Sequence, residues 1–379
     1  MRPSRRRPHP LVLLFALVLF GPILVGLGGA VYECKMYSGG GSAPRPPAPP
    51  GADAAQAAAG SLTYLRPEDQ TYLTFPEWYI VYSADEYAGF IASRRPSAFP
   101  YFEAVRQYWQ GYYDVCGVTR DRYPFNADDH TMLAVIGASF TAENVFKGIY
   151  ENTIGRASEW TASGGVTPEE AYGRQVAAEY GTFIHTVPWY SFPFWSKLRP
   201  LWDMPLGNPN VVRRVERRFA LSLEYALKGG YGWAIEKATE SAYAPEDQEI
   251  LARAEGVTPE LAQHEPGLRI VQAGENGAAL VALPRYEAFT QLVPRLLGQG
   301  VRFTEIAGNH EIMVTVLAPS DWRYSPPEGA VLFSLPVPSQ PSRSRFALQV
   351  PVGSLQTVVG DVARPTPTGS VVLEHIYDY

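Results

Sequence analysis

The chain has 379 residues, of which 46% are hydrophobic and 18% are charged, and it has a formal net charge of −6 at pH 7. This length is enough for two ordinary domains or one large one. The negative charge argues against a nucleic-acid partner, which needs clustered Lys and Arg, and against a broad attraction to anionic lipid.

The N-terminus combines a basic stretch with an apolar one. Residues 1–10 contain four arginines and no acid, and residues 11–31 contain no charged residue. At about 1.5 Å per residue, this apolar run just spans a hydrocarbon core of ~30 Å. The arginines place the N-terminus on the cytoplasmic side. We therefore predict a single-pass transmembrane anchor over 11–31, and the alternative is a signal peptide cleaved after Ala30.

The following residues, 32–61, are rich in Gly, Ala and Pro, so we predict a disordered spacer. The bias toward Ala, Gly, Pro and Arg is typical of a GC-rich bacterial genome, which makes the predicted location the bacterial inner membrane, facing the periplasm or cell wall. Cys34 lies beside the predicted anchor and Cys116 in a folded segment. We therefore expect free thiols rather than an internal disulfide, with intermolecular pairing through Cys34 as the alternative.

The pattern over 62–258 predicts a mainly helical domain. Within 129–154, apolar residues at helical spacing form one stripe that includes Met132, Val135 and Ile149. The run Thr-Pro-Glu-Glu at 167–170 is a strong helix-start signal, because it offers a cap, a proline in the first turn and acids near the helix N-terminus. Helices are expected over 101–115, 129–154, 167–185, 210–240 and 246–255.

The pattern over 266–379 changes to short strands that alternate with short helices. Strands are expected over 279–283, 301–306, 311–317, 331–337, 346–350 and 370–377, and helices over 286–297 and 353–362. This order predicts an α+β ferredoxin-like domain with an inserted hairpin. Such folds have many unrelated functions, so the fold alone indicates none.

The segment 187–206 is unusually rich in aromatic residues and prolines. Trp and Tyr favour boundaries that are apolar on one side and wet on the other, so the segment can contact a lipid, a ligand or a membrane surface. The competing interpretation is a strap packed over the helical core. The candidate contact residues are Trp189, Tyr190, Phe192, Phe194, Trp195 and Trp202.

Candidate catalytic residues are few. His185 ends a predicted helix and could act as a general acid or base, with Glu179, Glu151 or Glu143 as the helix carboxylates beside it. The blander interpretations are a capping histidine and a solvated Glu-Lys-Glu stripe. The motifs of serine nucleophiles and phosphate-binding loops are absent from the sequence. No Glu-x-x-His pair for a bundle metal site occurs, so we expect no metal and no cofactor.

These observations favour a non-enzymatic, membrane-anchored accessory or binding protein whose aromatic surface meets a lipid, an envelope component or a partner protein. One alternative is an envelope enzyme that uses His185 and the helix carboxylates. A weaker alternative is a metal- or haem-binding helical bundle.

Overall fold

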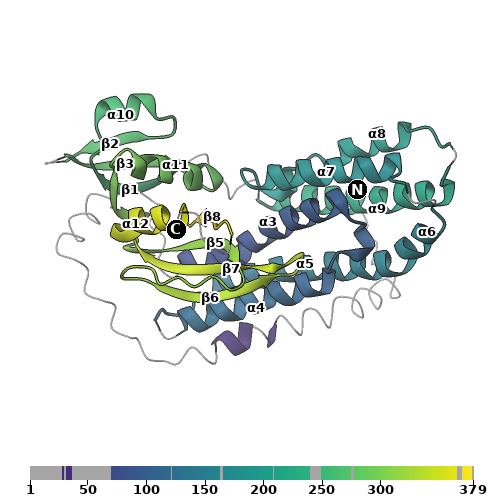
Figure 1. The fold of residues 1–379 in the computed structure, drawn as a ribbon, viewed down its shortest axis with the longest axis horizontal. Helices are drawn as coiled ribbons and strands as arrows, with labels where there is room; N and C mark the ends of the chain where they lie inside the picture. Colours follow the sequence, from purple (N-terminus) through teal and green to yellow (C-terminus); the bar gives the residue numbers. More distant parts are fainter. Residues whose placement is uncertain are drawn as a thin grey trace, which may run out of the picture.

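The computed structural model describes residues 28–29, 31–35, 70–120, 122–162, 165–207, 209–239, 249–274, 277–364 and 369–377. These residues form a helical part and two antiparallel four-stranded sheets. Along the longest axis of the molecule, the helical part occupies one end, the first sheet the other end, and the second sheet lies between them (Figure 1).

The structure does not support the predicted transmembrane helix. Among the described residues, no helix is both long enough and apolar enough to cross a lipid bilayer. Most of the predicted anchor, positions 11–27 and 30, lies outside the described residues, as do positions 36–61 of the predicted spacer. The fold class with an N-terminal transmembrane helix and the single-pass, membrane-anchored envelope protein are therefore withdrawn. Residues 31–35 instead form a short helical turn.

The helical part follows the predicted order of helices. The expected helices over 101–115, 129–154, 167–185 and 210–240 coincide with four of those observed. The elements are α3 (Gln70–Ser93), η1 (Pro96–Ala98), α4 (Tyr101–Thr119), α5 (Ala127–Tyr150), the π-helical turn η2 (Glu151–Gly155), α6 (Arg156–Trp160), α7 (Pro168–Ile184), η3 (Trp189–Ser191), η4 (Phe194–Lys197), α8 (Leu198–Asp203) and α9 (Val211–Thr239).

Local chemistry explains where two of these helices begin. The Thr167 hydroxyl accepts from the Glu170 backbone N–H, and the Glu170 carboxylate accepts from the Thr167 N–H, which is a capping box with Pro168 in the first turn of α7. In α5 the cap is Asn126, whose side chain accepts from the Asp129 N–H at 3.3 Å.

The first sheet has the strand order β2-β3-β1-β4, and every neighbouring pair is antiparallel. Its elements are β1 (Glu249–Glu255), α10 (Pro259–His264), β2 (Arg269–Ala273), β3 (Ala278–Pro284), α11 (Glu287–Gly298) and β4 (Arg302–Ile306). The predicted helix over 246–255 is therefore wrong where it can be seen. Ile250, Ala252 and Ala254 are buried at alternate positions of a strand, so the period is two rather than 3.6.

The second sheet repeats the strand order of the first. Its order is β6-β7-β5-β8, which is the first order with every strand number raised by four. Its elements are β5 (Glu311–Pro319), β6 (Ala330–Val337), β7 (Gln340–Pro351), η7 (Val352–Ser354), α12 (Leu355–Val362) and β8 (Val372–Ile376). Between β5 and β6, where the first unit has α10, all residues are described and none is helical.

The predicted single ferredoxin-like domain over 266–379 is therefore wrong. The β-α-β-β-α-β order of that fold runs from β1 to β4, over 249–306, and the strands after 311 belong to a second sheet. The strand patterns themselves gave no sign of which strands share a sheet, because pairing partners are far apart in the sequence.

The central strand β5 is buried on both faces. Ile312, Val314 and Val316 pack into the core that also contains residues of α11 and α12. Met313 lies in the second core, which includes α3 residues, and Thr315 shares a hydrogen bond of 2.8 Å with Tyr82 of α3. The second sheet is thus covered by the helical part on one face and by the first sheet unit on the other.

A buried arginine connects the helical part to the second sheet. Arg345 of β7 donates from Nη2 to Glu86 of α3 at 3.1 Å and from Nε to Glu374 of β8 at 2.6 Å. Its guanidinium also lies 4.0 Å from the ring centroid of Tyr82. All three charged groups are nearly inaccessible to water, so each needs the others to offset the cost of burial.

Candidate functional site

His185 has carboxylate neighbours, but not the predicted ones. It follows the last turn of α7, and its Nε2 lies 2.7 Å from Asp85 Oδ2 of α3 while its Nδ1 lies 3.3 Å from Glu287 Oε2 of α11. These hydrogen bonds raise the pKa of His185 to about 10, although burial opposes the charge. The imidazole is therefore a cation at neutral pH and has no lone pair with which to act as a base.

The three predicted helix carboxylates lie in other ion pairs. Glu179 pairs with Lys197, Glu151 with Arg217 and Glu143 with Lys228. Each of these carboxylates already has a cation on it, and the structure does not bring the three together with His185.

The interface between α5 and α9 contains a ladder of charges. The two helices run antiparallel, since Ser139 contacts Tyr231 at one end and Tyr150 contacts Glu216 at the other. Between these contacts, Glu224 Oε1 accepts from Lys147 at 2.8 Å and lies 3.4 Å from Lys228 Nζ. Lys147 and Glu151 of the expected solvated stripe are thus turned inward, whereas the Glu143 side chain is 43% exposed.

The electrostatics of this ladder favour full ionisation. Burial alone would raise the pKa of the Glu224 carboxyl, but Lys147 and Lys228 lower it to about 2. Burial opposes the charge on Lys147, but Glu224 beside it raises the pKa of the Lys147 ammonium above its usual value. The group is therefore a set of mutually compensated charges.

A second buried network closes the end of the helical part at the start of α9. The guanidinium of Arg213 donates to Glu170 at 2.7 Å, to Glu159 at 3.1 Å and to Glu216 at 3.0 Å. The next residue, Arg214, and Arg218 one turn after it both bind the fully buried Glu169. Arg213, Arg214 and Arg218 each already bind a carboxylate of the protein, which fits a structural role rather than an anion site.

The charges of α9 therefore face inward, and its apolar residues face outward. All seven charged residues between Val211 and Trp233 have side chains that are at most 23% exposed. The opposite side of the same helix consists of exposed apolar residues at helical spacing. We call this surface, with the adjoining exposed residues of α5, the α5–α9 outer face: Val135, Phe146, Ile149, Val212, Val215, Phe219, Leu223, Leu227 and Trp233.

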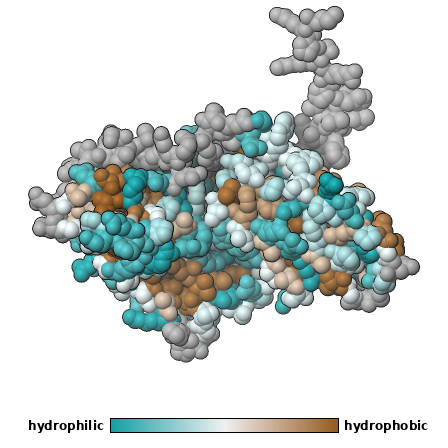
Figure 2. Space-filling model, turned by 90° about the horizontal axis from the view of Figure 1, so that it is seen from above, coloured by the Kyte–Doolittle hydropathy of each residue, from teal (hydrophilic) through white to brown (hydrophobic). Residues whose placement is uncertain are grey.

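Every residue of the α5–α9 outer face is between 47% and 64% exposed. From Val212 to Trp233, the row on α9 is ~32 Å long at about 1.5 Å per residue. Hydrophobic side chains also reach the surface in several patches of the view in Figure 2. Single exposed leucines are common on protein surfaces and need no explanation. A continuous apolar row on a helix whose charged residues point inward is instead typical of an interaction surface.

The aromatic segment divides between core and surface. Phe192 and Phe194 are buried in a small core with Leu201, and Trp189 packs beside it. Trp195 and Trp202 are 55% and 58% exposed. The core-packing interpretation therefore holds for Phe192 and Phe194, whereas contact of Trp195 and Trp202 with a lipid, a ligand or a membrane stays a prediction.

The two exposed tryptophans lie against α9. Trp202 donates from its indole nitrogen to Ser222 at 2.9 Å, and the Trp195 ring covers Gly229, where a Cβ would lie 2.8 Å from its nitrogen. They extend the α5–α9 outer face to one side. Tyr190, the remaining candidate of the segment, packs its backbone against Gly232.

The expectation of free thiols is wrong, because Cys34 and Cys116 form a disulfide with their Cα atoms 5.7 Å apart. The helical turn over 31–35 packs against α4, where the Tyr113 hydroxyl donates to Glu33 at 3.2 Å. Residues 31–35 are therefore part of the folded protein and not part of the predicted anchor or spacer. This placement brings Cys34 beside Cys116, which no spacing in the sequence could indicate.

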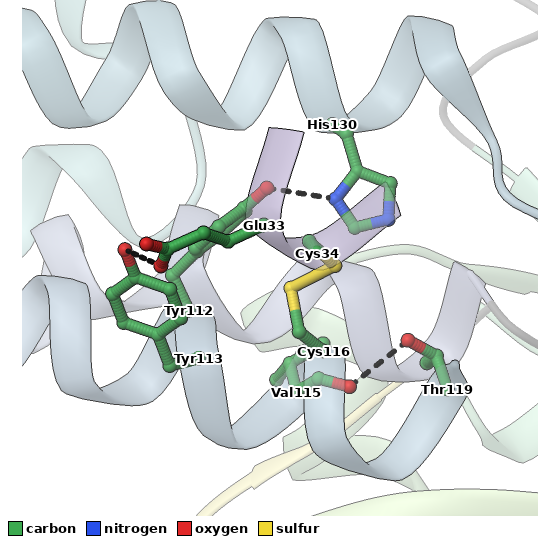
Figure 3. The surroundings of a disulfide bond; sticks show 8 residues. All are labelled: Glu33, Cys34, Tyr112, Tyr113, Val115, Cys116, Thr119 and His130. Carbon is green, nitrogen blue, oxygen red and sulfur yellow. Dashed lines mark hydrogen bonds between the residues drawn. A yellow bond between two sulfur atoms is a disulfide. The ribbon is translucent and has the colours of Figure 1, made fainter. Parts of the chain in front are cut away.

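His130 completes a compact group around the disulfide. Figure 3 shows the imidazole, which extends from α5, next to the sulfur atoms, with Cys116 on α4 and Cys34 on the helical turn. One ligand atom from each residue lies within 4.8 Å of the others, and all three residues are buried. The Tyr112 hydroxyl lies 3.0 Å from Nδ1, and the Phe125 ring stacks on the imidazole at 4.4 Å.

The comparisons with known proteins leave the geometry as the guide to function: no family model, no curated protein and no solved structure matches the chain.

Proposed function

We propose that the protein binds lipid through the α5–α9 outer face. The observation that carries this proposal is the orientation of α9. Its charged residues face the interior of the protein, and its apolar side faces outward. Lipid acyl chains match such a surface, because they need neither hydrogen bonds nor charges from the protein. This interaction requires no membrane-spanning helix, since an apolar face can lie in the boundary of a lipid layer.

The exposed tryptophans favour lipid over a second protein. Trp233 lies near one end of the row on α9. Trp160 lies near the other end, directly after Glu159, which pairs with Arg213. Indole rings prefer the level of lipid headgroups, where one edge meets water and the rest meets apolar chains. With the apolar row lying in the boundary of a lipid layer, both tryptophans reach the headgroup level at its two ends.

We also propose that the folded part works in an oxidising compartment outside the cytoplasm. The Cys34–Cys116 disulfide supports this, because disulfides persist mainly where thiols are not continually reduced.

Vesicle flotation of the full chain tests the lipid proposal. Neutral phosphatidylcholine vesicles are the suitable probe, because the net charge of −6 makes electrostatic attraction to anionic lipid a poor basis for binding. The double variant Phe219→Glu/Leu223→Glu should lower the fraction that floats at least tenfold. Burying one such side chain contributes about 1.5–3 kcal/mol, and a glutamate in its place opposes insertion.

The matched control is Val271→Glu on β2, a valine that is 41% exposed but distant from the helical part. It should leave flotation unchanged. Equal flotation of the double variant and the wild type would contradict the proposal. So would a wild-type dimer that ignores vesicles and becomes a monomer in the double variant, because the face would then be a protein interface.

A further inference from the structure

We propose that Cys34, Cys116 and His130, once the disulfide is reduced, form a binding site for a thiophilic d10 metal ion, Zn²⁺ or Cu⁺. The disulfide and the metal complex would exclude each other. The site is independent of the α5–α9 outer face, and its test can fail without affecting the lipid proposal.

The first support is the arrangement of the donor atoms. Three ligand atoms of types that bind soft or borderline metals lie within 4.8 Å of one another, which one ion can bridge after small side-chain rotations. The donors come from three separate segments: the helical turn over 31–35, α4 and α5. A metal would therefore hold the N-terminal turn to the helical part as the disulfide does.

The second support is the state of His130. The His130 side chain is buried, and its imidazole stacks on the Phe125 ring with the centroids 4.4 Å apart, which limits its rotation. In the tautomer that leaves a lone pair on Nε2 for the ion, Nδ1–H donates to the Tyr112 hydroxyl oxygen 3.0 Å away, and this bond fixes the ring. Metal-binding histidines are commonly oriented by a hydrogen bond at the other nitrogen in this way.

The third support is access. Two pockets adjoin the sulfur atoms: one is lined in part by Cys34, Thr119 and His130, and the other in part by Cys34, Cys116 and Gly117. An ion, a reductant or a water ligand can therefore approach a group that is otherwise buried. A water in the fourth position would complete the tetrahedral shell that Zn²⁺ prefers.

The chemistry balances in two steps. A dithiol reductant transfers two electrons and two protons to the disulfide, which gives two cysteine thiols and leaves the reductant as a disulfide. The ion then binds the two thiolates and the neutral imidazole, and the two thiol protons are released to solvent.

Metal titration of the full chain tests the site. The protein is reduced with a phosphine, which is removed by gel filtration because phosphines themselves bind Cu⁺, and is then titrated with Zn²⁺ or Cu⁺ against a chromophoric chelator. Reduced wild type should bind one ion and oxidised wild type none. Replacing the Zn²⁺ by Co²⁺ should give a thiolate-to-cobalt charge-transfer absorption.

Variants assign the ligands. His130→Asn should weaken binding by the reduced protein at least ~100-fold, and Tyr112→Phe about tenfold, because the first removes a ligand and the second only its orienting partner. The control His310→Asn, in the turn before β5, should bind like wild type. Failure of reduced wild type to bind either ion, or equal binding by His130→Asn, would overturn the proposal.

Discussion

His185 joins three elements through two hydrogen bonds: it ends α7, Asp85 belongs to α3 and Glu287 begins α11. The arrangement explains why a histidine occupies this position, since one imidazolium can donate to two carboxylates from opposite sides. The sequence indicated that His185 is special but gave the wrong partners. Asp85 and Glu287 are 100 and 102 residues away, and only the tertiary fold brings them near.

We expect the stabilising contribution of His185 to depend on pH in the alkaline range. Its pKa is raised from 6.5 to about 10 on folding, so its stabilising contribution is complete below pH 6.5 and is lost as pH rises through about 10. Asp85 is half exposed, which screens the interaction, so we expect a loss of only about 1–2 kcal/mol.

Urea unfolding of wild type and His185→Asn at pH 6.5 and pH 9.5 measures this effect. The free energy of unfolding should fall more for the wild type than for the variant between the two values. The same fall in both proteins would show that the pair of carboxylates does not hold the proton.

Helices α5 and α9 show what a periodic pattern can and cannot predict. The apolar stripe of 129–154 correctly indicated a helix, but three of its residues, Met132, Val135 and Ile149, are exposed. The charged stripe with Lys147 and Glu151 was expected in solvent and is instead turned inward. A periodic pattern shows that a helix has two different faces, but it does not show which face is buried. Here the charged face is buried because its partner charges lie on α9.

We expect the charge ladder to make the stability of this helix pair fall at acidic pH. Lys147 and Lys228 depress the folded pKa of Glu224 to about 2 from 4.5, so its contribution is present above pH 4.5 and is lost as pH falls through about 2. Glu224→Gln should lower the free energy of unfolding at pH 7 by about 3–5 kcal/mol, since it leaves two lysines without their central carboxylate.

The control for this variant is Glu103→Gln, an exposed position on α4. It should change stability by less than about 0.5 kcal/mol. Thermal unfolding followed by circular dichroism from pH 7 to pH 2.5 should show a flatter pH dependence for Glu224→Gln than for the control. Parallel curves would contradict an ionised, compensated Glu224.

On the scale of the whole molecule, two sheet units of the same strand order follow one helical part along the chain. Most strands after residue 278 were predictable from the alternation of apolar and polar residues. Their division into two sheets was not, because strand pairing joins residues that are far apart in the sequence. The Cys34–Cys116 disulfide was also not predictable, since it connects two segments 82 residues apart in the sequence. The α5–α9 outer face likewise becomes visible only when the inward side of both helices is known.

The central claim is that this face contacts lipid, and fluorescence quenching tests it most directly. Phosphatidylcholine vesicles with brominated acyl chains should quench part of the tryptophan emission of the full chain. Trp233→Phe should remove a distinct share of that quenching, because Trp233 is 61% exposed on the face. Trp322→Phe should not, because Trp322 is buried beside the second sheet. Equal quenching in wild type and Trp233→Phe would contradict the account.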